Sequence, residues 1–181
     1  MEKNIWITKG ARFNASRRLI RKHNASIMTI SILSLYNIGI GIVPEHFLSQ
    51  FISDDWQSPL AVLLSVFILI LSLLEVSHSY ELKSDRLHRN AVAISELSSL
   101  EASEARKKYD ELIRECPENH SPVDDKKFRA EHPHEFNLEC EVKGYKFLGV
   151  TGWWYMLLSL ADTYWLYCCL LFSPIVLFLL Q

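Results

Sequence analysis

Residues 59–76 read PLAVLLSVFILILSLLEV, and this stretch decides what kind of protein the chain forms. It carries a single charge, Glu75, and it opens with a proline, which is favoured at the first position of a helix. A helix needs about twenty mostly apolar residues to cross a bilayer. The stretch therefore predicts a transmembrane helix.

A second apolar run, SIMTISILSLYNIGIGIV at residues 26–43, comes before it and has no charge. The linker at residues 44–58 holds three acids and no base, whereas basic residues flank the far side of both runs. Cytoplasmic flanks of membrane helices are enriched in Lys and Arg. We therefore expect a two-helix hairpin with both ends in the cytoplasm and a short acidic loop outside.

The overall composition hides this division. The 181 residues have a formal net charge of −2, a pI near 6.4 and a mean hydropathy of +0.07, which averages very apolar and very polar segments. All 19 Lys and Arg residues lie within residues 1–25 and 77–146. A near-neutral chain gives no electrostatic reason to expect direct nucleic-acid binding.

The C-terminal apolar run, residues 147–180, allows two interpretations. As one helix it would be about 50 Å long, which is too long for one untilted span and too short for two. In the favoured interpretation, residues 147–161 form an interfacial helix and Asp162 caps a third span whose C-terminus is outside. In the other, a tilted helix from about Trp154 leaves Asp162 in the hydrocarbon, at a cost of about 2.5–3.5 kcal/mol. Pro174 is expected to kink the last helix.

From the start of the second span onward, residues 60–116 contain neither Gly nor Pro. We therefore expect the second span to continue as a long helix into the cytoplasm, with a break near Ser98, where Ser98 and Glu101 fit a capping box. Residues 79–115 have an amphipathic pattern that needs a partner surface, either another subunit or the cytoplasmic N-terminus. The short segments Phe128–Ala130 and Glu135–Val142 are left unassigned.

Small and polar residues follow one side of each predicted span of the hairpin. They are Ser31, Ser34, Asn37 and Gly41 on the first span, and Ala61, Ser65, Ser72 and Glu75 on the second. Such stripes allow helices to approach closely and to form interhelical hydrogen bonds, and they also occur along water-filled pores. Both interpretations, helix packing and a pore lining, remain open.

Glu75 is an ionisable residue near the cytoplasmic end of a span. Such residues often serve as proton relays, selectivity rings or counter-ions. The structural alternative is that Glu75, which shares a face with His78, reaches interfacial water or pairs with Arg17 or Arg18.

The basic residues before the first span are expected to set the topology and to contact anionic lipid. They are Arg12, Arg17, Arg18, Arg21 and Lys22. The segment lacks the Gly-rich loop and the stacking aromatics of nucleotide or nucleic-acid sites.

Signatures of catalysis and of metal binding are missing from the sequence. Cys116, His120, His132, His134 and Cys140 match no standard zinc spacing. Cys168 and Cys169 lie in an apolar run and are expected to be apolar filler rather than a disulfide. No GxSxG, HExxH or Walker sequence occurs. We expect no enzyme, no cofactor and no metal.

Several segments in this order resemble a known family. The basic segment at residues 12–19 leads into a span that begins His23-Asn24-Ala25-Ser26, and a closely spaced second span follows. A cytoplasmic helix ending Tyr109-Asp110-Glu111-Leu112 then precedes Asn119-His120-Ser121-Pro122-Val123-Asp124 and Phe128. Across residues 9–130 this pattern resembles the SLATT proteins, bacterial two-helix transmembrane effectors of nucleotide-linked and antiviral defence loci. The extra C-terminal segment resembles the branch encoded beside reverse transcriptases.

The resemblance implies an effector that self-assembles and damages or depolarises its own cell's membrane when a partner detects infection. It also implies a partner, either a neighbouring reverse transcriptase or a nucleotide-signal system. Tyr109, His120, Asp124 and Phe128 are the candidate gating or partner residues of the cytoplasmic part. The family supplies no catalytic residues.

Together these observations predict an all-α integral membrane protein of the bacterial inner membrane. A basic cytoplasmic N-terminal helix (1–25), a transmembrane hairpin (26–76), a cytoplasmic helical module (77–146) and an interfacial segment with a third span (147–181) would assemble as a homo-oligomer. The expected action is membrane permeabilisation gated through the module. The alternatives are a non-conducting anchor or scaffold for a cytoplasmic partner, and a small proton-coupled transporter that uses Glu75 and Asp162.

Overall fold

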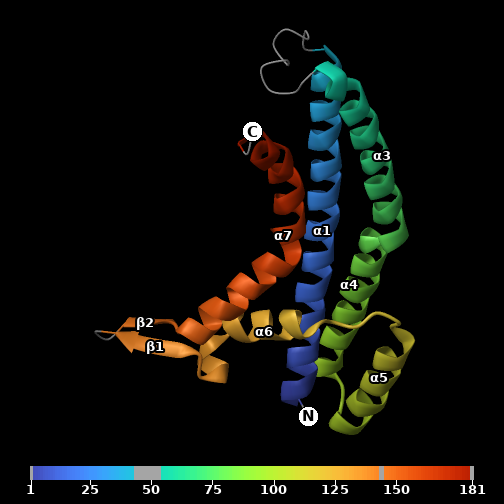
Figure 1. The fold of residues 1–181 in the computed structure, drawn as a ribbon. Helices are drawn as coiled ribbons and strands as arrows, with labels where there is room; N and C mark the ends of the chain where they lie inside the picture. The colour runs from blue at the N-terminus through green and yellow to red at the C-terminus, as the bar shows by residue number, and fades with distance from the viewer. Residues whose placement is uncertain (1, 43–53, 143–144, 180–181) are drawn as a thin grey trace. The chain divides into compact units, whose positions relative to one another are not determined.

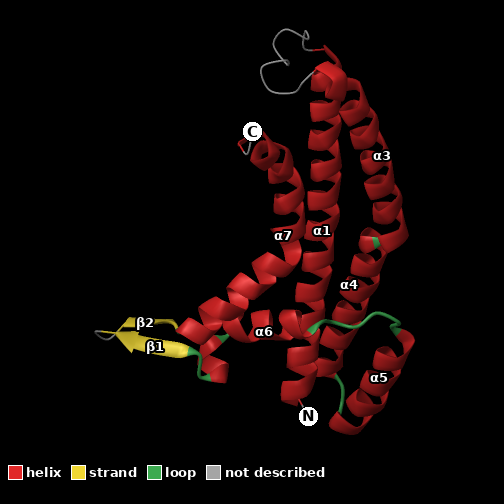
Figure 2. Cartoon of the chain, in the orientation of Figure 1, coloured by secondary structure: helices red, strands yellow, loops and turns green. Residues whose placement is uncertain are grey.

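The computed structural model describes residues 2–42, 54–142 and 145–179, and it is almost entirely helical (Figure 1, Figure 2). The elements are α1 (Glu2–Ile42), α3 (Asp54–His78), α4 (Tyr80–Glu96), η1 (Leu97–Ser99), α5 (Ala102–Glu115), α6 (Pro122–Glu131), η2 (Pro133–Phe136), β1 (Glu139–Val142), β2 (Tyr145–Leu148) and α7 (Val150–Leu179). The predicted all-α class is confirmed.

The chain divides into two compact units. Met1–Arg21 and Tyr80–Thr163 form the first, which we call the polar unit, and Lys22–Ser79 and Tyr164–Gln181 form the second, the apolar unit. Each unit is therefore assembled from segments that are far apart in the sequence.

Three helical stretches are long and apolar enough to cross a membrane. They are Lys3–Ile42, Val150–Phe172 and Ser58–Ser99, the last of which is interrupted at Ser79 between α3 and α4. Their apolar side chains are exposed rather than packed inside the protein: Leu35 is 66% exposed, Leu73 63% and Val76 77%. Side chains of this kind need a surrounding apolar phase, which supports the predicted spans.

The predicted continuous helix from the second span into the polar region is wrong. Ser79 has a φ of 50°, in the left-handed region, and it separates α3 from α4. Its hydroxyl donates a hydrogen bond to the carbonyl of Val76, at 3.2 Å. The break therefore falls at the boundary between the two units.

The predicted break near Ser98 is present, but its capping box is not. Residues 97–99 form a 3-10 turn, and the Ser98 hydroxyl donates to the carbonyl of Ser95 at 2.9 Å. The residue that caps α5 is Glu101, which has an extended backbone and makes no side-chain capping bond. Ser98 cannot serve as the cap because the turn places it before the helix begins.

The prediction that Asp162 begins a helix is also wrong, because α7 runs through it from Val150. Residues 145–148, which overlap the start of the predicted interfacial segment at 147–161, form a strand that pairs with β1 in antiparallel order, with Glu139 opposite Leu148. Side chains from residue 173 onward, including Pro174, lie outside the described residues, as do residues 43–53, which include most of the predicted acidic loop at 44–58.

The amphipathic region after residue 79 finds its partner surface in the N-terminal part of α1. Ile94, Leu97 and Ala105 form a buried cluster against which Ile5 of α1 packs. Ser16 of α1 and Ser84 of α4 are joined by a buried hydroxyl–hydroxyl bond of 2.9 Å. This is the second of the two partner surfaces that the sequence allowed.

Helix α6 packs against the same end of α1 from another side. The ring of Phe128 lies directly over Gly10, so that a Cβ at Gly10 would overlap the ring. Phe128 also contacts Trp6, with ring centroids 4.7 Å apart in an edge-on arrangement. His132 and Phe136 complete this aromatic cluster.

We expect Gly10→Ala to lower the free energy of unfolding by about 1–3 kcal/mol, because the added methyl forces Phe128 out of its position. Thermal unfolding of the detergent-purified protein measures the change. Gly39→Ala is the matched control, since a Cβ there meets no atom within 4 Å and alanine favours a helix. Equal effects of the two substitutions would contradict the packing described.

Candidate functional site

Arg18 of α1 lies at the centre of a three-helix ion-pair network in the polar unit. Its Nε donates to Asp124 Oδ1 at 2.8 Å and its Nη2 to Asp124 Oδ2 at 3.0 Å. Its Nη1 donates to Asp162 Oδ2 of α7, also at 3.0 Å. Bidentate guanidinium–carboxylate pairs are strong and fix the orientation of both groups. Arg18 thereby joins α1 to both α6 and α7.

Asp124 is held in place by the start of its own helix. It is the third residue of α6, in a capping box with Ser121. The backbone N–H of Ser121 donates to Asp124 Oδ2 at 2.8 Å and the Ser121 hydroxyl donates to the same atom at 2.9 Å. The Asp124 carboxylate is only 1% exposed, so Arg18 and these donors take the place of water around it.

The predicted lipid-contacting basic residues separate into two groups. Arg12 is 2% exposed, and its Nη1 donates a hydrogen bond to the Asn90 side chain. Arg18 belongs to the ion-pair network with Asp124 and Asp162. Arg17 and Arg21 are exposed, and Lys22 is half-buried. Contact with anionic lipid therefore stays a prediction for the exposed residues, while Arg12 faces the interior of the polar unit.

The four candidate gating residues all lie in the polar unit, and α1 is the element that three of them contact. The Tyr109 hydroxyl shares a 2.9 Å bond with Thr8, Phe128 covers Gly10, and Asp124 binds Arg18. The arrangement spreads these residues along α1 and does not collect them into one pocket.

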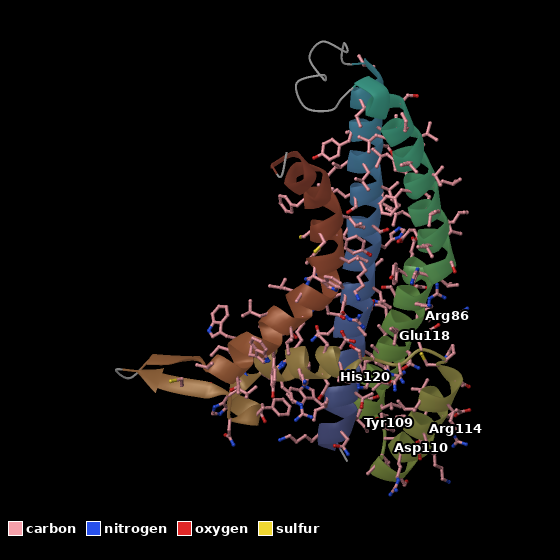
Figure 3. The ribbon with its side chains drawn as sticks, viewed as in Figure 1. Arg86, Tyr109, Asp110, Arg114, Glu118 and His120 are labelled. Carbon is pink, nitrogen blue, oxygen red and sulfur yellow. The ribbon has the colours of Figure 1, made fainter. Side chains whose placement is uncertain are left out.

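His120, the fourth, lies in the segment between α5 and α6 (Figure 3). Its Nδ1 is buried and has no hydrogen-bond partner among the described residues. Burial lowers the pKa of His120 below its ordinary value, and the nearby charge of Arg12 adds to this effect. Near it at the surface, Arg86 and Glu118 form an ion pair of 3.5 Å.

In the apolar unit, the polar stripes of the two spans meet at one place. Asn37 Nδ2 of α1 donates to Ser65 Oγ of α3 at 2.8 Å. The other stripe serines donate to backbone carbonyls four residues earlier in their own helices: Ser31 to Ile27, Ser34 to Ile30 and Ser72 to Ile68. A Cβ at Gly41 would meet no atom within 4 Å, so this part of the first stripe is open.

Glu75 has a partner that the sequence analysis did not name. Its Oε1 lies 2.7 Å from Nδ1 of His23 on α1, within the apolar unit. The expected pairing with Arg17 or Arg18 is not observed, and His78 instead bonds through Nδ1 to the carbonyl of Leu74, at 2.7 Å.

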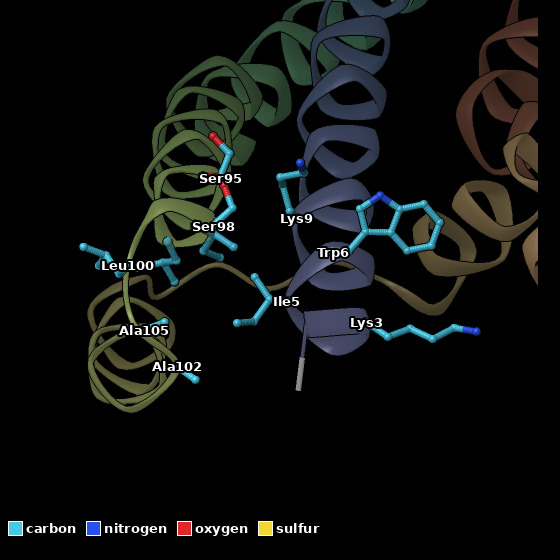
Figure 4. A pocket seen from close by; sticks show the side chains of 11 residues that line it. Lys3, Ile5, Trp6, Lys9, Ser95, Ser98, Leu100, Ala102 and Ala105 are labelled. Carbon is cyan, nitrogen blue, oxygen red and sulfur yellow. Dashed lines mark hydrogen bonds between the residues drawn. The ribbon is translucent and has the colours of Figure 1, made fainter.

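A cleft of about 820 Å³ lies between the first turns of α1 and the α4–η1–α5 corner (Figure 4). Its walls include Ile5, Leu100 and Ala105, with Lys9 and Ser95 at its edge. The Ser95 hydroxyl donates to its own helix backbone. The cleft therefore combines apolar walls with two lysines, Lys3 and Lys9.

The predicted absence of a metal site stays a prediction. Among the described residues no three His, Cys, Asp or Glu side chains are placed to hold a metal ion. The four cysteines, Cys116, Cys140, Cys168 and Cys169, are free thiols.

Sequence reasoning missed the partners of Arg18 because they lie 106 and 144 residues away. It also missed Lys127, which is 9% exposed and projects from α6. The only sequence signal for Lys127 was its helical spacing from Asp124 and Glu131, residues that bind α1.

Comparison with protein families gives one full-length match. The model described as SMODS and SLOG-associating 2TM effector domain family 5 matches residues 1–180. No curated protein and no solved structure matches the chain.

We expect Asp124→Asn to lower the free energy of unfolding of the polar unit by about 3 kcal/mol, because it leaves the Arg18 guanidinium without its buried counter-charge. Asp162→Asn should cost less than about 1 kcal/mol, since the Asp162 side chain is 38% exposed. Thermal unfolding in detergent compares the two variants. A larger effect at Asp162 would contradict the assigned importance of the Asp124 pair.

The lowered pKa of His120 predicts a pH dependence of stability. The unfolded chain, with an ordinary histidine pKa near 6.5, binds the proton more readily than the folded chain does. Stability should therefore be complete above about pH 6.5 and fall as the pH drops through the folded-state pKa. Unfolding curves from pH 7.5 to 5 should show this loss, and His120→Gln should reduce it. His134→Gln, at a side chain that is 77% exposed, is the control.

Proposed function

Because the chain belongs to SMODS and SLOG-associating 2TM effector domain family 5, we propose that it acts in bacterial antiviral defence by permeabilising the inner membrane. The observation that carries this proposal is the exposure of three apolar helices, including Val62 at 60% and Leu63 at 64%. These helices require lipid or other copies of the chain around them. A membrane is therefore where the protein acts.

Assembly into a homo-oligomer is part of the proposal. Two or three helices cannot enclose a water-filled path alone, so several copies would have to line one. Exposed Ser31 and the open surface at Gly41 lie on the stripe that would meet a neighbouring copy. Small and polar residues of this kind favour close helix packing within membranes.

The Arg18 network supports gating through the polar unit. Arg18 and Asp162 lie on α1 and α7, which both continue as apolar helices, and Asp124 lies on α6, which does not. A ligand or partner that moves α6 would remove the Asp124 contacts from Arg18. We propose that this release is the step that converts a closed assembly into a conducting one.

The orientation in the proposal follows from the charge distribution of the sequence. Residues 1–25 and 77–146 would be cytoplasmic, where a reverse transcriptase or a nucleotide-signal system could reach the polar unit. The action proposed is physical rather than enzymatic.

A non-conducting anchor is the second candidate function, and one observation favours it. The hydroxyls of Ser31, Ser34 and Ser72 donate to their own backbones, as serines do within ordinary membrane helices. Such serines do not by themselves indicate a wet pore. The transporter alternative has less support, because Glu75 is paired with His23 and Asp162 with Arg18.

Membrane potential, read with a voltage-sensitive dye during titrated expression in bacteria, tests conduction. We expect the chain alone to depolarise cells at high expression and Arg18→Gln to do so at lower expression, because the variant loses its contacts with Asp124 and Asp162. Glu75→Gln should change the size of the response, since Glu75 lies on the polar stripe. Arg89→Gln removes the same charge from an exposed i,i+4 pair and is the matched control.

Protein levels in the membrane fraction must be equal for the comparison. If neither the chain nor Arg18→Gln depolarises cells, even with the neighbouring gene added back, the protein is an anchor. If Arg89→Gln acts like Arg18→Gln, the gating role of the network is refuted.

A further inference from the structure

Two cations of α1 and one of α6 act on one another electrostatically in the polar unit, where α6 contacts α1 through Asp124 and Glu131. Arg17 and Arg21 are one helical turn apart on α1, and Lys127 comes from α6. Arg17 and Arg21 are exposed, and neither has a hydrogen-bond or ion-pair partner among the described residues. They differ in this from Arg18 between them, which has two carboxylate partners.

The contacts on either side of Lys127 direct it toward this part of α1. At one end of α6, Asp124 binds Arg18, and at the other, Glu131 Oε2 accepts a 2.7 Å bond from Asn14 Nδ2. Lys127 lies between the two, three residues after Asp124 and four before Glu131, on the same face of the helix. It is 9% exposed, so its side chain is enclosed at the crossing.

The positive charge at this crossing exceeds the negative charge. Lys127 Nζ is 3.9 Å from Glu131 Oε1, and that carboxylate is shared with Asn14. Asp124 is already occupied by Arg18 and Ser121. Burial lowers the pKa of Lys127, and the charges of Arg21 and Arg17 act in the same direction. An enclosed lysine beside two exposed arginines, with one shared carboxylate, is an arrangement that favours the binding of an anion.

We propose that Arg17, Arg21 and Lys127 together bind one phosphate group at the α1–α6 crossing. Two guanidinium groups supply paired N–H donors that match phosphate oxygens, and the ammonium adds a point charge from the enclosed side. The site requires neither conductance nor assembly, so it goes beyond the proposed function and stands independently of it.

Two sources could supply this chemistry, a phospholipid headgroup or a soluble phosphate. Arg21 is five residues before Ser26, where the charge-free run of α1 begins, and this is about 8 Å of helix. Basic residues at that distance from a span lie at the level of anionic headgroups. The position favours an anionic phospholipid.

The test uses the full chain purified in a neutral detergent. Its unfolding temperature is followed while dioleoylphosphatidylglycerol, dioleoylphosphatidylcholine or inorganic phosphate is added at constant ionic strength. We expect phosphatidylglycerol to raise the unfolding temperature more than phosphatidylcholine does. The triple variant Arg17→Gln/Arg21→Gln/Lys127→Gln should raise the apparent Kd for phosphatidylglycerol about tenfold or more.

Two further variants keep the test decisive. Arg17→Gln/Arg21→Gln changes only exposed side chains, so it tests the site even if the substitution at Lys127 weakens folding. Arg106→Gln/Lys107→Gln/Lys108→Gln removes three exposed charges from α5 and should leave the apparent Kd unchanged.

Stabilisation by phosphatidylglycerol that the site variants lose supports a lipid source, and stabilisation by inorganic phosphate alone that they lose supports a soluble one. The proposal is overturned if neither phosphatidylglycerol nor inorganic phosphate stabilises the protein. It is also overturned if the site variants retain full binding, or if the α5 variant loses as much as they do.

Discussion

A guanidinium removed from water must find its counter-charge inside the protein, and Arg18 meets this requirement through segments that are far apart in the sequence. Its side chain is 13% exposed, and its partners are a carboxylate at the start of α6 and another within α7. Breaking such a pair costs more than forming it gains, because the remaining charge stays buried. The polar unit therefore depends on α1, α6 and α7 being present together.

In the polar unit, α4 and α6 both pack against the N-terminal half of α1. One side of it meets α4 through Ser84 and Asn90, and another meets α6 through Phe128 and Asp124. Gly10 permits the close approach of an aromatic ring that any larger residue would prevent. A single helix thus provides the surface on which α4 and α6 pack, and Arg17 and Arg21 remain exposed on it.

The parts of this structure that follow from local sequence were predictable. Apolar runs without charge identify the membrane helices, and the basic flanks separate polar from apolar segments. Ser79 was not predictable, because no Gly, Asn or Pro marks it and serine seldom adopts a positive φ. The strands carry a weak signal, alternation around Lys143-Gly144, which is too short to stand alone. Asp162 was misassigned as a cap because α7 continues through it and its carboxylate binds Arg18, 144 residues away in the sequence.

The spacing between Arg18 and its partners also has a consequence for synthesis. Ribosomes add about 5–20 residues per second, so the 144 residues that separate Arg18 from Asp162 take roughly 7–29 s to make. Both helices of the hairpin leave the ribosome before the network can close. The apolar segments of the nascent chain are therefore available for membrane insertion while its polar unit is still incomplete. At that stage the contact between Arg18 and Asp162 has not yet formed.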